Sequence, residues 1–132
     1  MDEILAVLSG DRAPELVYLT SLPDVEEVAA LCRDRDLRLF VFDGDQIATK
    51  ADFLTICANV MQFPDYFGYN WDAFEDCLTD LSWLPAPGYV VLYRPPHTLA
   101  ATEPGNWAIL LEIFQTALDY WSSTPTPLYI FL

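Results

Sequence analysis

Basic residues are scarce in this sequence. Its 132 residues include only six lysines and arginines against 20 aspartates and glutamates, which gives a formal net charge of −14. After residue 50 the only fixed cation is Arg94, whereas nine acidic residues lie in 51–132. Because such a chain is repelled by a phosphate backbone, the composition argues against direct nucleic-acid binding and favours a basic partner.

Motifs for metals and nucleotides are also lacking. The sequence contains no Cys-x-x-Cys, no phosphate-binding loop and no Gly-x-Gly-x-x-Gly. His97 is the single histidine and lies in a proline-rich loop with no serine or cysteine motif beside it, so a surface or partly packed position is favoured over catalysis. We therefore expect no cofactor and no metal site built from thiolates or imidazoles.

Long hydrophobic runs are missing as well. The longest apolar segments, such as 39–42 and 89–93, are far shorter than the roughly 20 residues of a membrane-spanning helix. Residues 4–8 follow two acidic residues rather than the basic start of a secretory signal. The three cysteines are widely spaced in apolar helical patterns, which is typical of reduced core thiols. These features predict a cytoplasmic protein. The cysteines are Cys32, Cys57 and Cys77.

The apolar residues that are present predict one α/β domain. A hydrophobic content of 53% and an aromatic content of 14% supply enough apolar surface for a core. Because the strand-like runs are apolar throughout, we expect a small, mostly parallel sheet of three to four strands with helices on both faces, in one domain over 1–132. Strands are predicted over 16–20, 37–42, 89–93 and 128–132, and helices over 3–8, 23–34, 49–61, 71–81 and 106–121.

Local signals refine some boundaries. Ser21, with Asp24 three residues later, resembles a capping box that starts the 23–34 helix. Asn70 is the expected N-cap of the 71–81 helix, and Gly68 would tolerate a positive φ in the turn before it. Residues 95–105 are predicted to form a proline-broken, mobile loop. The 106–121 helix is apolar on most sides, so we expect it to be largely buried.

The helix predicted over 71–81 carries an unusual outer face. With about 100° of rotation per residue, its apolar residues share one half of the helix and its acidic residues share the other. The pairs Asp72–Asp76 and Asp76–Asp80 are like charges four residues apart, each costing roughly 0.2–0.5 kcal/mol in an isolated helix. No lysine or arginine balances them, which suggests a face selected for something other than stability. The outer half holds Asp72, Glu75, Asp76, Thr79 and Asp80.

Several interpretations of these carboxylates are open. They could form a plain solvated face, a general acid–base pair, or a divalent-cation site with oxygen ligands. The last two need a facing wall, which the sequence does not indicate. Aromatic residues bracket the acidic segment, where they could pack in the core or lie at an interface; we expect Phe67 and Trp71 to be inside. An acidic surface ringed by aromatic side chains could occupy a cationic pocket. The bracketing residues are Tyr66, Phe67, Tyr69 and Trp83.

The stretch FPDYFGYNWDAFEDCLTDL, residues 63–81, resembles the signature of the barstar family, intracellular inhibitors of barnase-type ribonucleases. It combines Pro-x-Tyr-x-Gly-x-Asn with x-Asp-Ala-x-x-Asp-Cys-Leu-Thr. The similarity runs over about 37–132. Residues 1–36 have no counterpart and are expected to form an N-terminal extension that adds a strand and a helix at the edge of the sheet.

The resemblance implies a small parallel sheet packed by helices, with the acidic helix and the loop before it plugging the active site of a nuclease. It also implies that Asp72 and Asp76 meet basic residues that would otherwise grip RNA phosphates. The protein would then be a non-enzymatic inhibitor or immunity protein that imitates RNA phosphates. Other positions matching the contact surface are Tyr66, Gly68, Asn70, Ala73 and Thr79.

Two departures from the family pattern make this surface more acidic and less aromatic. Glu75 stands where a tryptophan is expected, and Asp80 where a small glycine is expected; both are included in the predicted partner surface. A family glutamate on the late helix aligns near Thr116, and Glu112 lies one turn away as a possible substitute. The alternative is a barstar-like binding module that regulates a basic partner other than a nuclease. Neither hypothesis involves direct nucleic-acid or membrane binding.

Overall fold

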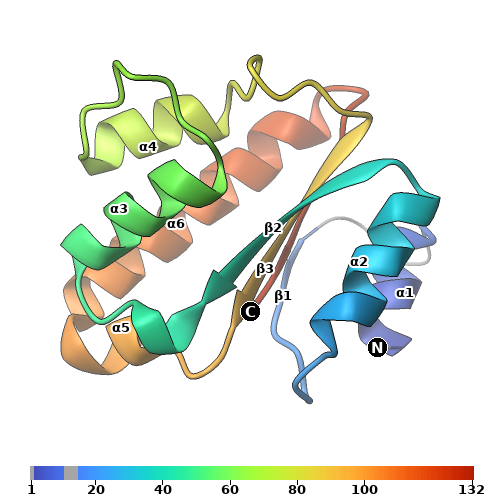
Figure 1. Cartoon of the computed structure of the whole chain (residues 1–132), viewed down its shortest axis with the longest axis horizontal. Helices are drawn as coiled ribbons and strands as arrows, with labels where there is room; N and C mark the ends of the chain where they lie inside the picture. The colour runs from blue at the N-terminus through green and yellow to red at the C-terminus, as the bar shows by residue number, and fades with distance from the viewer. Residues whose placement is uncertain (1, 11–14) are drawn as a thin grey trace.

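Four strands and six α-helices follow one another along residues 2–10 and 15–132, the residues that this computed structural model describes (Figure 1). A 3-10 turn, η1, follows the second strand. In chain order the elements are α1 (Asp2–Leu8), β1 (Leu16–Val17), α2 (Val25–Asp34), β2 (Leu37–Asp43), η1 (Gly44–Gln46), α3 (Lys50–Val60), α4 (Trp71–Leu78), β3 (Gly88–Arg94), α5 (Thr98–Thr102), α6 (Pro104–Ser122) and β4 (Leu128–Phe131).

The four strands form one parallel sheet in the order β1-β4-β3-β2. β2 pairs with β3 along its whole length, from Leu37 opposite Gly88 to Asp43 opposite Arg94. β1 has only two residues, fewer than the predicted 16–20, although the Leu19 amide still donates to the Leu132 carbonyl at 2.8 Å. The sheet confirms the predicted α/β class with a parallel arrangement, and it leaves β2 as an edge strand.

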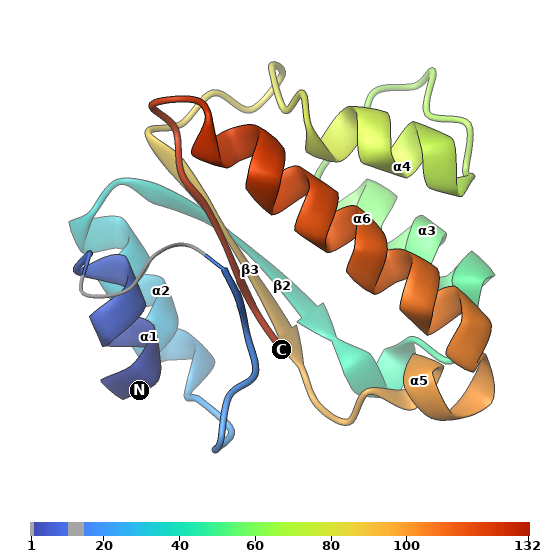
Figure 2. The same ribbon diagram turned by 180° about the vertical axis from the view of Figure 1, so that it is seen from behind.

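Helices cover both faces of the sheet (Figures 1 and 2). On one side α3 and α6 pack against the strands, with α4 lying outside them and α5 beside η1 and α6; on the other side lie α1 and α2. Because both faces are covered, every residue of β3 from Gly88 to Tyr93 is buried. A second, smaller hydrophobic core lies between the helices α1 and α2 and the face of the sheet that they cover. Its fully buried members include Ile4, Val28, Val90, Leu92 and Phe131.

The loop predicted over 95–105 contains a helix, so that prediction was wrong. α5 spans Thr98–Thr102, and Leu99 in its first turn is fully buried. The Thr102 hydroxyl donates to the Ala48 carbonyl, which ties α5 to the segment before α3. The flanking prolines indicated a break in the chain, but the residues between Pro96 and Pro104 are enough to form the five-residue helix α5.

Two other expectations need correction. α2 begins at Val25 with Asp24 as its N-cap, because the Asp24 carboxylate accepts from the Glu26 amide at 2.9 Å; Ser21 does not cap it. α6 is buried along one face only. Ile109 is 38% exposed, because the outer side of α6 faces solvent rather than a further layer.

All three cysteines are free and buried, as predicted for core thiols. Burial raises the pKa of Cys32 to about 11 and also raises the pKa values of Cys57 and Cys77. These thiols therefore stay protonated near neutral pH, and they are poor nucleophiles and poor metal ligands in the folded protein.

Candidate functional site

The acidic helix α4 begins where the sequence predicted it. Asn70 has extended backbone angles and its side-chain oxygen accepts from the Ala73 amide at 2.8 Å, so it acts as the N-cap. The same side chain donates from Nδ2 to the Gly68 carbonyl at 3.2 Å. One side chain thus fixes both the start of α4 and the loop that precedes it.

Gly68 has a different role from the one predicted. The residue with a positive φ before the helix is Tyr69, at +52°, and Gly68 does not have one. A Cβ atom added at Gly68 would lie 3.0 Å from Asn70 Nδ2. The absence of a side chain at Gly68 therefore allows the capping side chain to approach the loop closely.

α4 ends at Leu78, three residues earlier than predicted. The Thr79 hydroxyl donates to the Glu75 carbonyl at 2.8 Å, and the Asp80 amide bonds to Cys77 rather than continuing the helix. Leu81 has a φ of +52° and is fully buried, so the chain turns inward after the helix. Within α4, Asp72 and Asp76 therefore form the one like-charge pair four residues apart. The predicted helical pair Asp76–Asp80 was wrong, because Asp80 lies beyond the end of the helix.

Two tryptophans attach α4 to α6. Trp71, at the start of α4, donates from Nε1 to Asn106 Oδ1 at 3.2 Å. Trp121, near the end of α6, donates from Nε1 to the Leu78 carbonyl at 2.9 Å. Between them Phe74 is fully buried. These contacts hold the acidic face of α4 in a fixed orientation on the helical layer.

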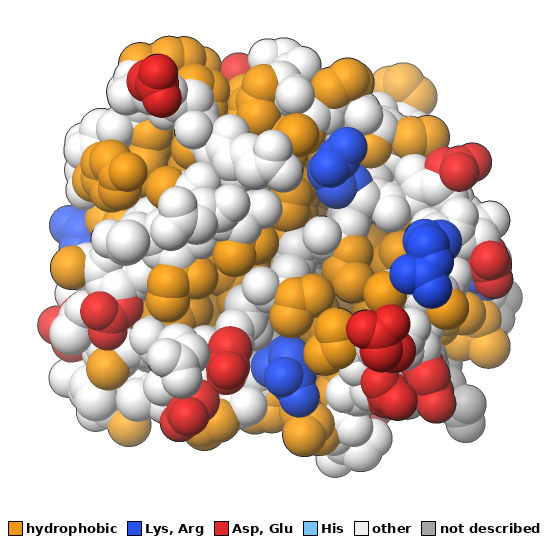
Figure 3. Space-filling view, in the orientation of Figure 1, with side chains coloured by type: hydrophobic (Ala, Val, Ile, Leu, Met, Phe, Trp, Pro, Cys, Tyr) orange, Lys and Arg blue, Asp and Glu red, His pale blue; other side chains and the backbone are white. Residues whose placement is uncertain are grey.

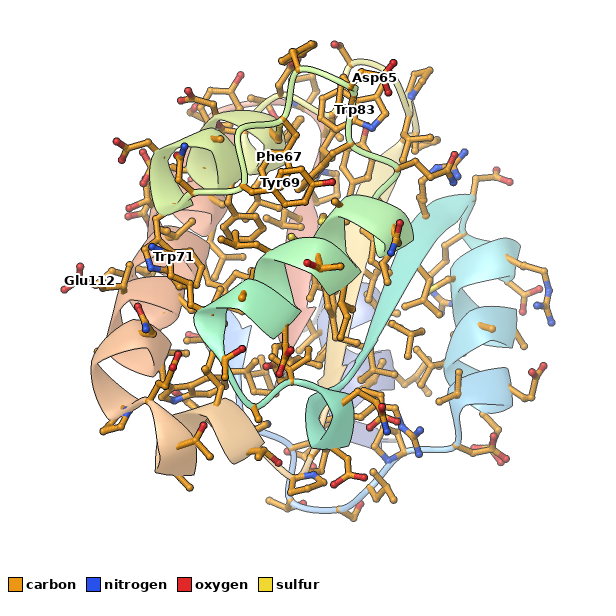
Figure 4. The ribbon with its side chains drawn as sticks, turned by 60° about the vertical axis from the view of Figure 1, so that its left-hand side comes forward. Asp65, Phe67, Tyr69, Trp71, Trp83 and Glu112 are labelled. Carbon is orange, nitrogen blue, oxygen red and sulfur yellow. The ribbon has the colours of Figure 1, made fainter. Side chains whose placement is uncertain are left out.

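The loop before α4 divides its aromatic residues between core and surface. Phe67 is buried as predicted, and its ring centroid lies 4.7 Å from that of Phe63 and 4.8 Å from that of Tyr69 (Figure 4). Trp71 is only half-buried. Tyr66 is 75% exposed and Tyr69 is 58% exposed, so both present ring surface to solvent next to α4.

The carboxylates of this region face solvent without a cation of their own. Asp72, Asp76 and Asp80 are exposed, and Glu75 is half-buried. None of the four makes an ion pair within the described part of the chain. Among the other predicted positions, Tyr66, Gly68 and Asn70 are exposed, whereas Ala73 and Thr79 are half-buried. We use the name acidic surface for the exposed and half-buried predicted residues, namely Tyr66, Gly68, Asn70, Asp72, Ala73, Glu75, Asp76, Thr79 and Asp80.

Two further carboxylates lie in or beside this region. Asp65 is exposed in the same loop and was not singled out from the sequence, although it stands between two signature residues, Pro64 and Tyr66. Glu112 is exposed and points outward from α6 on the side of the molecule that carries Trp71 (Figure 4). Among the described residues, no group of three or more His, Cys, Asp or Glu side chains is placed to hold a metal ion.

His97 lies apart from the acidic surface. Its ring stacks on Trp107 at 5.0 Å and meets the edge of Tyr93 at 5.7 Å. Burial lowers the pKa of His97, and an interaction with the Tyr93 backbone offsets part of that effect. Its Nε2 atom is buried and has no hydrogen-bond partner among residues 2–10 and 15–132, and the same is true of the Tyr93 hydroxyl. The packing is that of a partly buried histidine beside the core.

A family model described as Barstar (barnase inhibitor) matches residues 37–132. The match covers β2 to β4, including the acidic surface, and begins after α2. Among residues 2–10 and 15–132, no helix combines the length and apolar character needed to cross a membrane.

Proposed function

The chain belongs to the barstar family, and we propose that it inhibits a barnase-type ribonuclease by inserting its acidic surface into the basic active site of that enzyme. Family membership supports a barnase-inhibitor-like role in general, and the family is one of inhibitors rather than catalysts. The finer assignment, which names α4 and the loop before it as the contact, rests on the geometry of the residues involved.

The uncompensated pair Asp72 and Asp76 is the observation that carries this proposal. Both carboxylates are exposed on one helix, one turn apart, and neither is paired with a cation in the described part of the chain. Their mutual repulsion costs roughly 0.2–0.5 kcal/mol in an isolated helix. Basic residues of a partner that faces α4 would attract both carboxylates and so offset their mutual repulsion.

A ribonuclease has to present cations to the phosphates of its substrate. Carboxylates held on a rigid helix can occupy the same positions through charge-assisted hydrogen bonds, especially with arginine. The attachment of α4 to α6 through Trp71 and Trp121 holds Asp72 and Asp76 in place before binding. Little conformational entropy is then lost when the complex forms.

The exposed rings of Tyr66 and Tyr69 add apolar contact area at the edge of the acidic surface. Tyrosine buries a large area with few rotatable bonds, which suits the centre or border of an interface. Glu75 and Asp80 increase the negative charge next to Asp76, so the proposed partner carries more than two basic residues on the matching surface.

Long-range attraction should also speed association. A surface of one charge sign steers a partner of the opposite sign, a generalisation for which the barnase–barstar pair is itself a standard example. With a net charge of −14, this chain would attract a basic enzyme strongly at low ionic strength. Added salt should slow association, because screening shortens the reach of these charges.

A titration of ribonuclease activity tests the proposed function. Increasing amounts of the purified chain are added to a fixed concentration of barnase-type enzymes, at low and high salt. The proposal predicts complete loss of RNA cleavage at an equimolar ratio. Binding without loss of cleavage would instead support a module that regulates a basic partner by another route, and the absence of both from every enzyme tested would contradict the proposal.

A further inference from the structure

A second surface with the opposite charge lies at the free edge of the sheet. An open groove of about 450 Å³ separates the end of α2 from the loop that leads into β3. Its walls carry two arginines, from α2 and from β2, and three residues of the loop before β3. The lining residues are Arg33, Asp36, Leu37, Arg38, Leu39, Pro85, Ala86 and Pro87.

The two arginines are unusual in so acidic a chain. Arg33 and Arg38 are exposed, and neither makes an ion pair with any residue in 2–10 or 15–132. The sequence offers 20 carboxylates to its six basic side chains, so partners are abundant. Asp36 also lines the groove and reduces its local charge, but the two guanidinium groups still leave it basic.

The groove borders an unpaired strand edge. Among the strands that the structure describes, β2 is the last of the sheet and is bonded only to β3. In Figure 1 it runs in front of the sheet between α3 and α2, with no described element across its outer edge. The same view in Figure 3 shows hydrophobic surface between the helical layers, with Lys and Arg side chains on either side of it. Leu37 and Leu39 are half-buried at this edge.

We propose that this groove binds an acidic polypeptide segment in an extended conformation, which adds to the edge of β2 at Leu37–Leu39. Charge complementarity selects the occupant, because Arg33 lies on the α2 face of the edge and Arg38 points to the opposite face, with Phe40 and Phe42. The two arginines can therefore pair with carboxylates on adjacent residues of an added strand, whose side chains point to opposite faces. The half-buried leucines and Pro85 and Pro87 provide apolar contacts between those charges. An open groove beside a strand edge suits an extended chain better than a compact small molecule.

The groove and the acidic surface can be occupied at the same time. α2 and α4 lie on opposite sides of the sheet (Figures 1 and 2). None of the residues that line the groove belongs to the acidic surface. A basic partner at α4 and an acidic segment at β2 would therefore bind to one molecule without competing for contacts, so the two proposals can be tested separately.

Nuclear magnetic resonance titration of the full chain tests this inference. The probe is a short synthetic peptide with blocked ends and two adjacent glutamates between valines, beside a peptide of the same length in which glutamines replace the glutamates. The acidic peptide should shift the backbone amides of residues 33–39 and 85–88, and more weakly at high salt. The Arg33→Gln/Arg38→Gln variant should bind it roughly three- to thirtyfold more weakly, as expected for two exposed charge pairs.

The Arg35→Gln/Lys50→Gln variant has the same net charge, but both substitutions lie outside the groove lining, so it should retain binding within about twofold. Equal binding of the neutral peptide, or shifts unchanged in the Arg33→Gln/Arg38→Gln variant, would overturn the inference. So would tighter binding of a short oligoribonucleotide at the same amides. Concentration-dependent shifts of these amides without any peptide would assign the edge to a second copy of the chain and also overturn it.

Discussion

The indole Nε1 of Trp121 donates a hydrogen bond to the backbone carbonyl of Leu78 at 2.9 Å. Leu78 is the last residue of α4, and its carbonyl belongs to the group that a helix leaves unpaired at its end. Trp121 lies 43 residues further along the chain in α6. The contact satisfies a buried acceptor and at the same time fixes the end of the acidic helix next to Asp76 and Asp80.

The variant Trp121→Phe removes this donor while keeping an aromatic ring. It leaves the Leu78 carbonyl buried without a partner, which should lower the free energy of unfolding by about 1–3 kcal/mol. Urea denaturation measures that loss. Hydrogen exchange of the amides in 71–81 should become faster by more than the loss of global stability alone would cause. The neighbouring variant Tyr120→Phe, at a 47% exposed position, should change neither quantity noticeably. Unchanged exchange in α4 of Trp121→Phe would show that the contact does not hold the helix.

Substitution of the N-cap separates two roles of one side chain. Asn70→Ala removes the acceptor for the Ala73 amide and should cost about 0.5–2 kcal/mol of stability. Asn70→Asp keeps that acceptor but loses the donation to the Gly68 carbonyl, so it should retain most of the stability while loosening the loop. Thermal unfolding and the exchange rates of amides 66–70 distinguish the variants. Equal stability of Asn70→Ala and the unmodified chain would be incompatible with this cap.

The packing of His97 predicts a loss of stability in mild acid. Burial lowers its pKa below the ordinary value of about 6.5, so the unfolded chain takes up a proton at higher pH than the folded one. The contribution of neutral His97 is therefore complete above about pH 6.5 and is lost as the pH falls toward the folded pKa. Urea midpoints across this range should decline less in His97→Phe, which can still stack on Trp107. Parallel declines in the two proteins would assign the effect to other groups.

Two adjacent residues of α1, Ile4 and Leu5, should differ sharply in their contribution to the stability of the protein. Ile4 is fully buried in the smaller core, whereas Leu5 is 42% exposed. Ile4→Ala should therefore lower the free energy of unfolding by about 2–5 kcal/mol. Leu5→Ala removes a similar side chain from the same helix and should change it by no more than about 0.5 kcal/mol. Similar losses in the two variants would mean that α1 does not pack as described.

Elements whose ends are marked by a local change from apolar residues to turn or capping residues were predictable from the sequence. β2 exceeds its predicted range by one residue and β3 by two. The predictions came this close because the apolar strand runs are bounded by residues typical of turns, such as Asp43 and Gly88. The start of α4 was predictable because Asn70 is a strong N-cap residue followed by an amphipathic pattern.

The end of α4 was less accessible to sequence reasoning. Leu81 occupies an apolar position both in a continued helix and in a chain that turns inward, so periodicity alone does not distinguish the two. Nothing in the local sequence indicated the positive φ of Tyr69, because the neighbouring Gly68 adopts a positive φ more easily and was the expected position for it. The bond from Trp121 to Leu78 depends on how α6 packs, which no short stretch of sequence contains.

The most direct measurement of the central claim is the inhibition constant of Asp72→Asn/Asp76→Asn against a barnase-type ribonuclease that the unmodified chain inhibits. Each lost charge-assisted hydrogen bond is worth about 1.5–3 kcal/mol, so the variant should inhibit roughly 10²- to 10⁴-fold more weakly. The charge-matched control Glu26→Gln/Glu27→Gln, with two exposed residues of α2, should stay close to the unmodified chain. Equal inhibition by Asp72→Asn/Asp76→Asn and this control would contradict the claim that α4 imitates RNA phosphates.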